Sequence, residues 1–323
     1  MLLPLLFLLM AAGSEDFPPT LQSGPWPGAG HVQGVAIDQQ NRVVYYSFTN
    51  LLVKADLASG RVLGTLGGFH GHLGDLAFHD GRVYGSLEYK DAKAFYIAII
   101  DGAKINSPKL RAPGSDLMQT VYLPEVAADF ISGKYGCSGI DGVAFGPRFG
   151  DGAAGKLYLT VAYGIFEDVK RTDNDHQVLL QYDIADWERK YAQPLDELAP
   201  HKSGPATADG KYFVYTGNTK FGVQNLEYDA GTHTWLMGVY AGSKPGFPNY
   251  TLFAVDGRTK PRRTEIGLLL PAPRGWYQKA DVGMVSLGGG LFYLAVNQTR
   301  DGMQSAELRL HRWTGNGFSV TLH

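Results

Sequence analysis

The sequence predicts an all-β fold, and three observations lead to this expectation. Short apolar segments rich in β-branched and aromatic residues recur along the chain, separated by turns. Glycine accounts for 42 of the 323 residues, which suits many tight turns. Almost no window shows the apolar period of an amphipathic helix, and the best helix candidate is the short stretch 184–191.

Two elements recur five times in a fixed order. The first is short, largely apolar and rich in small residues, at 33–38, 74–79, 141–146, 224–229 and 282–287. After a turn comes the second, centred on an aromatic residue, at 43–48, 82–87, 156–161, 233–238 and 291–296. The aromatic residues Tyr45, Tyr84, Tyr158, Trp235 and Tyr293 hold equivalent places. Such a repeat indicates a fold built from similar units.

A third element completes each copy, at 51–56, 95–101, 178–183, 250–256 and 307–313. Four of these end in aspartate, where a carboxylate accepts hydrogen bonds from the backbone of a turn: Asp56, Asp101, Asp183 and Asp256. A fourth, outer strand is visible in some copies, at 61–66, 118–123, 265–270 and 318–322.

Four antiparallel strands repeated around a ring describe the blades of a β-propeller. We therefore expect an all-β chain with five four-stranded blades. A sixth blade is left open, because 211–215 is a further strand that could also be the outer strand of the third blade. A β-sandwich would not explain the aligned aromatic and aspartate residues. The domain prediction is a single propeller over 31–323, preceded by an N-terminal extension over 14–30.

The chain begins with an apolar run at 2–10, followed by small residues at 11–13. The run is too short to cross a bilayer and predicts a signal peptide over 1–13, hence a secreted, periplasmic or extracellular protein. A net charge of -2 without a basic cluster excludes nucleic acid as an expected partner. We expect a monomer without a membrane span. The lone Cys137 cannot form an intrachain disulfide, and a buried packing role is favoured over a nucleophile.

The geometry of a propeller directs attention to one face. The segments before each first strand and the loops between second and third strands meet at the same end of the central channel. Polar residues gather in these segments, including His31, Gln33, His72, Asp141 and Glu88. They predict a binding or catalytic site, although such residues also hold ordered water and satisfy strand ends in many channels.

We assign expected roles within this face by residue chemistry. The catalytic candidates are His31 and His72 as bases, Glu88 as an acid and Asp141 as the leading carboxylate. The substrate-binding candidates are Gln33, Gln224, Asn225, Asp175, His176 and Arg300. The metal candidates are Asp141, Asn225 and Asp281, whose oxygen atoms suit a divalent cation, Ca²⁺ first. The charged loop 171–176 is either a lid or a solvated loop.

The blade pattern over most of 31–322 resembles the propellers of the gluconolactonase, regucalcin and calcium-dependent phosphotriesterase type. The stretches 136–142 and 222–228 look like those of exported bacterial propeller proteins. The resemblance implies an axial metal held by Glu, Asn and Asp, for which Asn225, Asp141 and Asp281 match in kind. The first blade has His31 and Gln33 where that family has Glu, and the family usually has six blades.

These observations predict a hydrolase or lyase acting on a small ester, lactone or sugar-derived substrate, with a metal-assisted version left open. The alternative is a non-catalytic propeller that binds a glycan or a protein. It is motivated by aromatic residues expected near the same face, namely Tyr89, Tyr163, Phe247, Tyr250 and Trp276. A scaffold without ligand is a third, weaker option.

Overall fold

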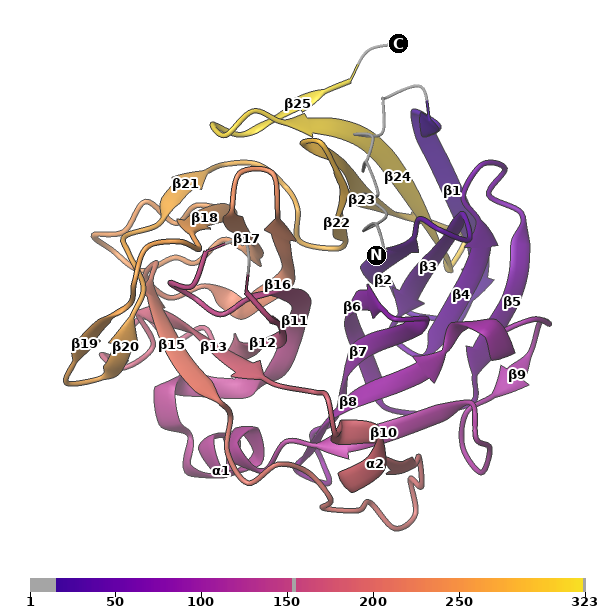
Figure 1. Cartoon of the computed structure of the whole chain (residues 1–323), viewed down its shortest axis with the longest axis horizontal. Helices are drawn as coiled ribbons and strands as arrows, with labels where there is room; N and C mark the ends of the chain where they lie inside the picture. Colours follow the sequence, from indigo (N-terminus) through magenta and orange to yellow (C-terminus); the bar gives the residue numbers. More distant parts are fainter. Residues whose placement is uncertain (1–15, 153–154, 322–323) are drawn as a thin grey trace, which may run out of the picture.

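The computed structural model describes residues 16–152 and 155–321, whose strands form five sheets around a central axis (Figure 1). The innermost strands are β2 (Val32–Asp38), β6 (His72–His79), β11 (Cys137–Pro147), β16 (Lys220–Asp229) and β22 (Met284–Gly288). This arrangement confirms the predicted five-bladed β-propeller. The predicted signal peptide, 1–13, lies outside the described residues.

Each innermost strand pairs with a second strand, and each second strand with a third, all antiparallel. The second strands are β3 (Val43–Phe48), β7 (Arg82–Tyr89), β12 (Leu157–Ile165), β17 (Thr234–Tyr240) and β23 (Leu291–Arg300). The third are β4 (Leu51–Asp56), β8 (Ala94–Asp101), β13 (His176–Tyr182), β18 (Leu252–Asp256) and β24 (Met303–Trp313). All three repeated elements are therefore strands, as predicted.

The aligned residues behave as their chemistry suggests. The aromatic side chains are buried in four blades, and Tyr158 is half-buried. Each of the four aligned aspartates accepts a backbone N–H two or three residues further on, for example Ser59 N to Asp56 Oδ1 at 2.8 Å and Ala103 N to Asp101 Oδ1 at 3.0 Å. The aspartates thus fix the turns that lead out of the third strands.

The outer strands of the first four blades are β5 (Val62–Gly67), β10 (Met118–Tyr122), β15 (Gly210–Tyr215) and β21 (Arg274–Trp276). The strand at 211–215 is therefore the outer strand of blade three and not part of a sixth blade. The expectation that 265–270 closes blade four is wrong. Its strand β20 (Gly267–Leu269) pairs with β15 of blade three, and β19 (Arg262–Thr264) pairs with β20.

This displaced hairpin follows a rule that three blades share. In blades two, three and four, the connection between the third and fourth strands reaches back to the outer edge of the preceding blade. β9 (Leu110–Arg111) pairs with β5, β14 (Gln193–Pro194) pairs with β10, and β20 pairs with β15. Each connection covers an edge that would otherwise present unpaired backbone groups.

The ring is closed by the two ends of the described chain. β1 (Thr20–Pro27), from the segment expected as an N-terminal extension, pairs antiparallel with β24 and places Thr20 opposite Arg309. β25 (Phe318–Val320) pairs with the remaining part of β24, from His311 to Trp313. The last blade therefore combines strands from both ends of the sequence (Figure 1).

Besides the strands, the described residues form two α-helices and the 3₁₀ turns η2 (Gly102–Lys104) and η3 (Lys134–Gly136). α2 (Trp187–Lys190) falls inside the predicted stretch 184–191, whereas α1 (Pro124–Ser132) was not predicted. Its signals were Pro124 in the first turn and Gly133, which ends the helix at φ 67°. No helix in the described ranges has the length and apolar character needed to cross a membrane.

Candidate functional site

Irregular strand pairing turns polar side chains toward the axis. Near the start of β2, β6, β11 and β16 the register with the second strand shifts. The residues at these bulges include Gln33, Asp75, Asp141 and Gln224. A bulge inserts an extra residue and changes the direction of its side chain, a device common beside active sites. Four blades thus contribute one polar residue each to the same end of the channel.

Three of them, Gln33, Asp141 and Gln224, border a cavity of about 490 Å³, which we call the central cavity, and its volume falls in the range of small-molecule sites. Its lining comprises His31, Gln33, His72, Lys90, Ser138, Asp141, Lys220, Phe221, Gln224 and Tyr240. Five predicted site residues therefore come together here: His31, Gln33, His72, Asp141 and Gln224.

Two neighbouring cavities of about 540 Å³ and 560 Å³ share His31 with the central cavity. The first contains the predicted metal candidate Asp281, together with Lys279 and Tyr240. The second is lined by Glu88 and Tyr89 among others. The site face is therefore a chain of joined hollows that meet at His31.

His72, on the wall of the central cavity, forms a pair with Glu88. The two residues are register partners on β6 and β7, and His72 Nδ1 lies 3.3 Å from Glu88 Oε2. Glu88 is buried; its Oε1 accepts Ile140 N at 2.6 Å and its Oε2 lies 3.1 Å from Lys90 Nζ. With both oxygens engaged, Glu88 is placed to orient His72, and its expected role as an acid stays a prediction.

Gly139, two residues before Asp141, makes this pairing sterically allowed. At Gly139 (φ +124°) a Cβ atom would lie 1.9 Å from Glu88 Oε1. The absence of a side chain at Gly139 therefore lets blades two and three approach closely. This is a structural reason for the glycine that does not require a ligand.

Burial lowers the pKa of His72, but the hydrogen bond to Glu88 and the charges of Asp141 and Glu88 outweigh it, so that the pKa is raised.

Asp141 is a buried carboxyl group with one unsatisfied oxygen. Its Oδ2 accepts a hydrogen bond from Gln224 Nε2 at 3.0 Å, whereas its Oδ1 has no hydrogen-bond partner among the described residues. Burial raises the pKa of Asp141 to about 7, against which the charge of His72 acts in the lowering direction. The group therefore changes its protonation near neutral pH.

His31 is shifted in the opposite direction. Burial, and after it the charge of His72, lower the pKa of His31 below its ordinary value. The central cavity thus combines a carboxyl group that keeps its proton to higher pH with an imidazole that gives it up at lower pH. Such an inverted pair is a feature of acid–base sites.

Beneath the cavity lies a second axial carboxyl group with a structural role, that of Asp75, whose pKa burial raises well above its ordinary value. Asp75 is fully buried and accepts hydrogen bonds from Val143 N at 3.0 Å, Leu226 N at 2.9 Å and Asn225 Nδ2 at 2.8 Å. Asn225 Nδ2 also lies 2.7 Å from the carbonyl oxygen of Gln33. These contacts join all four bulged blades, so Asn225, a predicted ligand residue, is part of the support under the cavity and does not line it.

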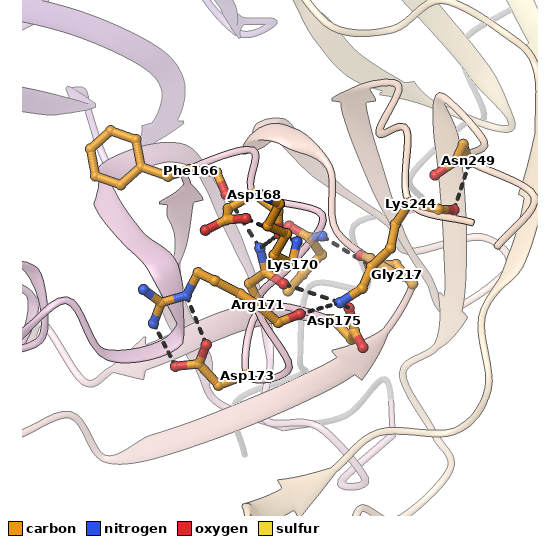
Figure 2. A network of polar contacts seen from close by, with 12 residues as sticks. Phe166, Asp168, Lys170, Arg171, Asp173, Asp175, Gly217, Lys244 and Asn249 are labelled. Carbon is orange, nitrogen blue, oxygen red and sulfur yellow. Dashed lines mark hydrogen bonds and ion pairs between the residues drawn. The ribbon is translucent and has the colours of Figure 1, made fainter. Parts of the chain in front are cut away.

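The charged loop between β12 and β13 is pinned by ion pairs, as Figure 2 shows. Lys244 Nζ lies 2.5 Å from both Asp175 Oδ1 and the carbonyl oxygen of Arg171, and Arg171 pairs with Asp173 at 2.7 Å. Asn174 is fully buried and donates to the carbonyl oxygen of Asp168 at 2.9 Å. These contacts disfavour the interpretation of this loop as a lid.

Besides Asn225, three predicted substrate-binding residues lie outside the central cavity. Asp175 is held by Lys244 in the network of Figure 2, and His176 packs on Tyr215 with ring centroids 5.0 Å apart. Arg300 stands at the end of β23 with 93% of its side chain exposed. Sequence position placed them on the site face but could not give their distance from the axis.

The predicted metal residues do not form a ligand set. Asn225 gives its amide nitrogen to Asp75 and Gln33, while Asp141 and Asp281 line different cavities. Within the described part of the chain, no group of three or more His, Cys, Asp or Glu side chains is arranged to hold a metal ion. Ca²⁺ binding stays a prediction, which calorimetric titration of the purified protein with CaCl₂ tests.

Lys220, Phe221 and Tyr240 line the cavity but were missed from the sequence. Lys220 and Phe221 precede the predicted start of the fourth inner strand, which the structure begins at Lys220 instead of Gln224. Residues at the start of an inner strand were expected to face the site. Both residues would have been predicted if the start of this strand had been placed at Lys220. Tyr163, expected near the face, is instead fully buried and donates to Asp129 Oδ2 at 2.8 Å.

No protein-family model matches the chain, and neither does any curated protein. It is similar to the PQQ-bound aldose sugar dehydrogenase of Streptomyces coelicolor, with 14% identity, coverage of 91% of this chain and 99% of that chain, and a TM-score of 0.38. The glutaminyl cyclase of Myxococcus xanthus has 11% identity and a TM-score of 0.43, and the match covers 91% of this chain and 95% of that chain. The PQQ domain of pyranose dehydrogenase from Coprinopsis cinerea has 11% identity and a TM-score of 0.40, and the match covers 85% of this chain and 81% of that chain. These values give no argument about function, and the propeller assignment rests on the strand pairing.

Proposed function

We propose that the central cavity hydrolyses an ester or lactone bond in a small sugar-derived molecule. The observation that carries this proposal is the inverted acid–base pair: the pKa of Asp141 is raised to about 7 and that of His31 is lowered. Near neutral pH a large fraction of Asp141 is protonated while His31 is neutral. One group is then ready to donate a proton and the other to accept one.

The proposed reaction balances without a cofactor. His31 takes a proton from a water molecule as the water oxygen bonds to the carbonyl carbon. Asp141 gives its proton to the alcohol oxygen as the carbon–oxygen bond of the ester breaks. The products are a carboxylic acid and an alcohol, or the open hydroxy acid from a lactone. Transfer of the proton from His31 back to Asp141 through solvent restores the starting state.

The surrounding side chains support a polar, hydroxyl-rich substrate. Gln33, Ser138, Gln224 and Tyr240 bring hydrogen-bonding groups to the cavity wall, and Phe221 adds an apolar ring. Sugars combine hydroxyl groups with an apolar ring face, and this lining offers a partner for each. His72, oriented by Glu88, adds a further donor or base on the same wall.

The test is a pH-stat assay of D-glucono-1,5-lactone and D-galactono-1,4-lactone, with the spontaneous reaction subtracted and p-nitrophenyl acetate as a non-sugar ester. D141N and H31Q are each expected to lower kcat/KM by about 100-fold or more. R300A, whose side chain lies outside the cavity, is the matched control. Because the acid form of Asp141 is needed, activity should fall as pH rises through about 7.

Absence of turnover for all three esters, or full activity of D141N, would contradict the proposed hydrolysis. The second candidate function is sugar binding without turnover, and the exposed aromatic ring of Phe221 in the central cavity favours it. Measurable binding of a lactone that stays intact over hours would support this candidate.

A further inference from the structure

Phe221 adopts a backbone conformation that a bulky residue rarely takes. Its φ of +64° lies in the left-handed region, which glycine occupies at little cost and a residue with a large side chain does not. The residue is nevertheless 45% exposed and lines the central cavity. A strained aromatic residue with a half-exposed ring is unusual where only a turn is needed, and such strain gathers at binding sites.

The surrounding structure holds this conformation and ties it to the acid–base pair. Pairing of β16 with β17 is interrupted between Lys220 and Val223, so Phe221 lies in a bulge. Its carbonyl oxygen accepts Gln224 Nε2 at 2.9 Å, and the same nitrogen lies 3.0 Å from Asp141 Oδ2. Next to it, a Cβ at Gly222 (φ +78°) would come within 2.3 Å of Tyr163 O, so the bulge packs tightly on blade three.

A cation stands beside the ring. Lys220 Nζ lies 5.4 Å from the centroid of the Phe221 ring, and the Tyr240 ring meets it edge to face at 6.2 Å. In the described ranges, no carboxylate forms an ion pair with Lys220, whereas the other lysine of the cavity, Lys90, is paired with Glu88. The charge of Lys220 is therefore available to an anionic ligand.

We propose that Lys220 and Phe221 form a subsite for a sugar ring that carries a carboxylate, the class of the hexuronic acids. The C–H face of the ring stacks on Phe221, and the carboxylate pairs with Lys220. This inference rests on the proposed function, because it uses the same cavity and narrows the substrate class to esters and lactones whose sugar ring carries a carboxylate. Its test measures binding, which is independent of turnover.

The experiment is isothermal titration of the full chain with D-galacturonate and with D-galactose, which differ by the carboxylate, and with benzoate as a planar non-sugar acid. The wild type is expected to bind galacturonate at least tenfold more tightly than galactose or benzoate. K220Q should lower the affinity for galacturonate to that for galactose, and the affinity for galactose should not change.

Substitutions of Phe221 separate a ligand contact from a packing role. F221G relieves the left-handed strain, so its melting temperature should equal or exceed that of the wild type, while both sugars bind at least tenfold more weakly. F221L keeps apolar bulk without a flat ring and should also bind at least tenfold more weakly. F221W keeps a flat ring and should retain binding.

Four results would each overturn the subsite: no binding of galacturonate by the wild type, tighter binding of benzoate, full binding by F221L, or a lower melting temperature for F221G. Failure of the hydrolysis assay with galacturonate binding intact would instead refute the proposed reaction and leave the subsite standing. The two proposals therefore fail in distinguishable ways.

Discussion

Replacing Asp141 with asparagine should stabilise the protein relative to the wild type, and by more at high pH than at low pH. The carboxyl group has an ordinary pKa of 3.8, and burial raises it to about 7 in the folded protein. Between these values the folded state binds a proton that the unfolded state does not. The free energy of unfolding of the wild type therefore falls as pH rises from about 4 to about 7. Asparagine is neutral throughout and has no such dependence.

The size of the effect follows from the shift. One pKa unit corresponds to about 1.4 kcal/mol, and Asp141 is half titrated at pH 7, so the rise from pH 5 to pH 7 costs the wild type roughly 2 kcal/mol. The neighbouring His72 acts in the same direction. Its pKa is raised in the folded state, so its contribution is present below the unfolded value of 6.5 and is lost as pH rises through the folded value. Asparagine can still accept the hydrogen bond from Gln224 through its carbonyl oxygen.

Urea unfolding of wild type and D141N at pH 5.0 and pH 8.0 measures this directly. The difference in unfolding free energy between D141N and wild type is expected to become more favourable to D141N by about 2 to 3 kcal/mol at the higher pH. D80N, which changes a side chain that is 87% exposed, is the control and should stay within about 0.5 kcal/mol of wild type at both pH values. An equal difference at both pH values would refute a protonated Asp141, and the proposed proton donor with it.

Three further predictions concern the support of the site. Asp75→Ala leaves Val143 N, Leu226 N and Asn225 Nδ2 without their acceptor. Urea unfolding should show a free energy of unfolding lower by about 3 kcal/mol or more. An unchanged value would mean that the side chain of Asp75 does not join the blades. Ser86→Ala removes the hydroxyl that donates to the carbonyl oxygen of Asp141 at 2.6 Å, and should cost about 1 to 2 kcal/mol, with S59A at an exposed turn as the comparison. Glu88→Gln removes a charge that raises the pKa of His72, so NMR titration should give a lower pKa for His72 in the variant, and an unchanged value would refute the orienting pair.

The repeat predicted the blades because it reports packing that every blade shares. Tyr45, Trp235 and Tyr293 are buried at equivalent places, and Asp56 and Asp256 fix equivalent turns. The hairpin of β19 and β20 does not follow the repeat. Its apolar run resembles an outer strand of blade four, yet it pairs with blade three. Local propensity identifies a strand but does not identify the sheet edge that receives it.

For the site, the sequence located the face and about half of the cavity. His31, Gln33, His72, Asp141 and Gln224 line it because the predicted inner strands point their first residues there. The bulges were not predictable, since a register shift leaves no clear mark in the composition. They place Asn225 below the cavity and bring Phe221 into it. The roles of Glu88 and Asp75 follow from burial and hydrogen bonds that only the folded chain defines.

The backward reach of the connections has a consequence for synthesis on the ribosome. The edges of β5, β10 and β15 are each covered by residues made later, in β9, β14 and β20. During synthesis, the outer strand of each of the first three blades therefore has an unpaired edge until part of the next blade has emerged. β24 reverses this order, because its partner β1 is made first and is already present when β24 appears. A chain stalled after one of these blades exposes a single unpaired edge strand, the kind of surface through which β proteins aggregate.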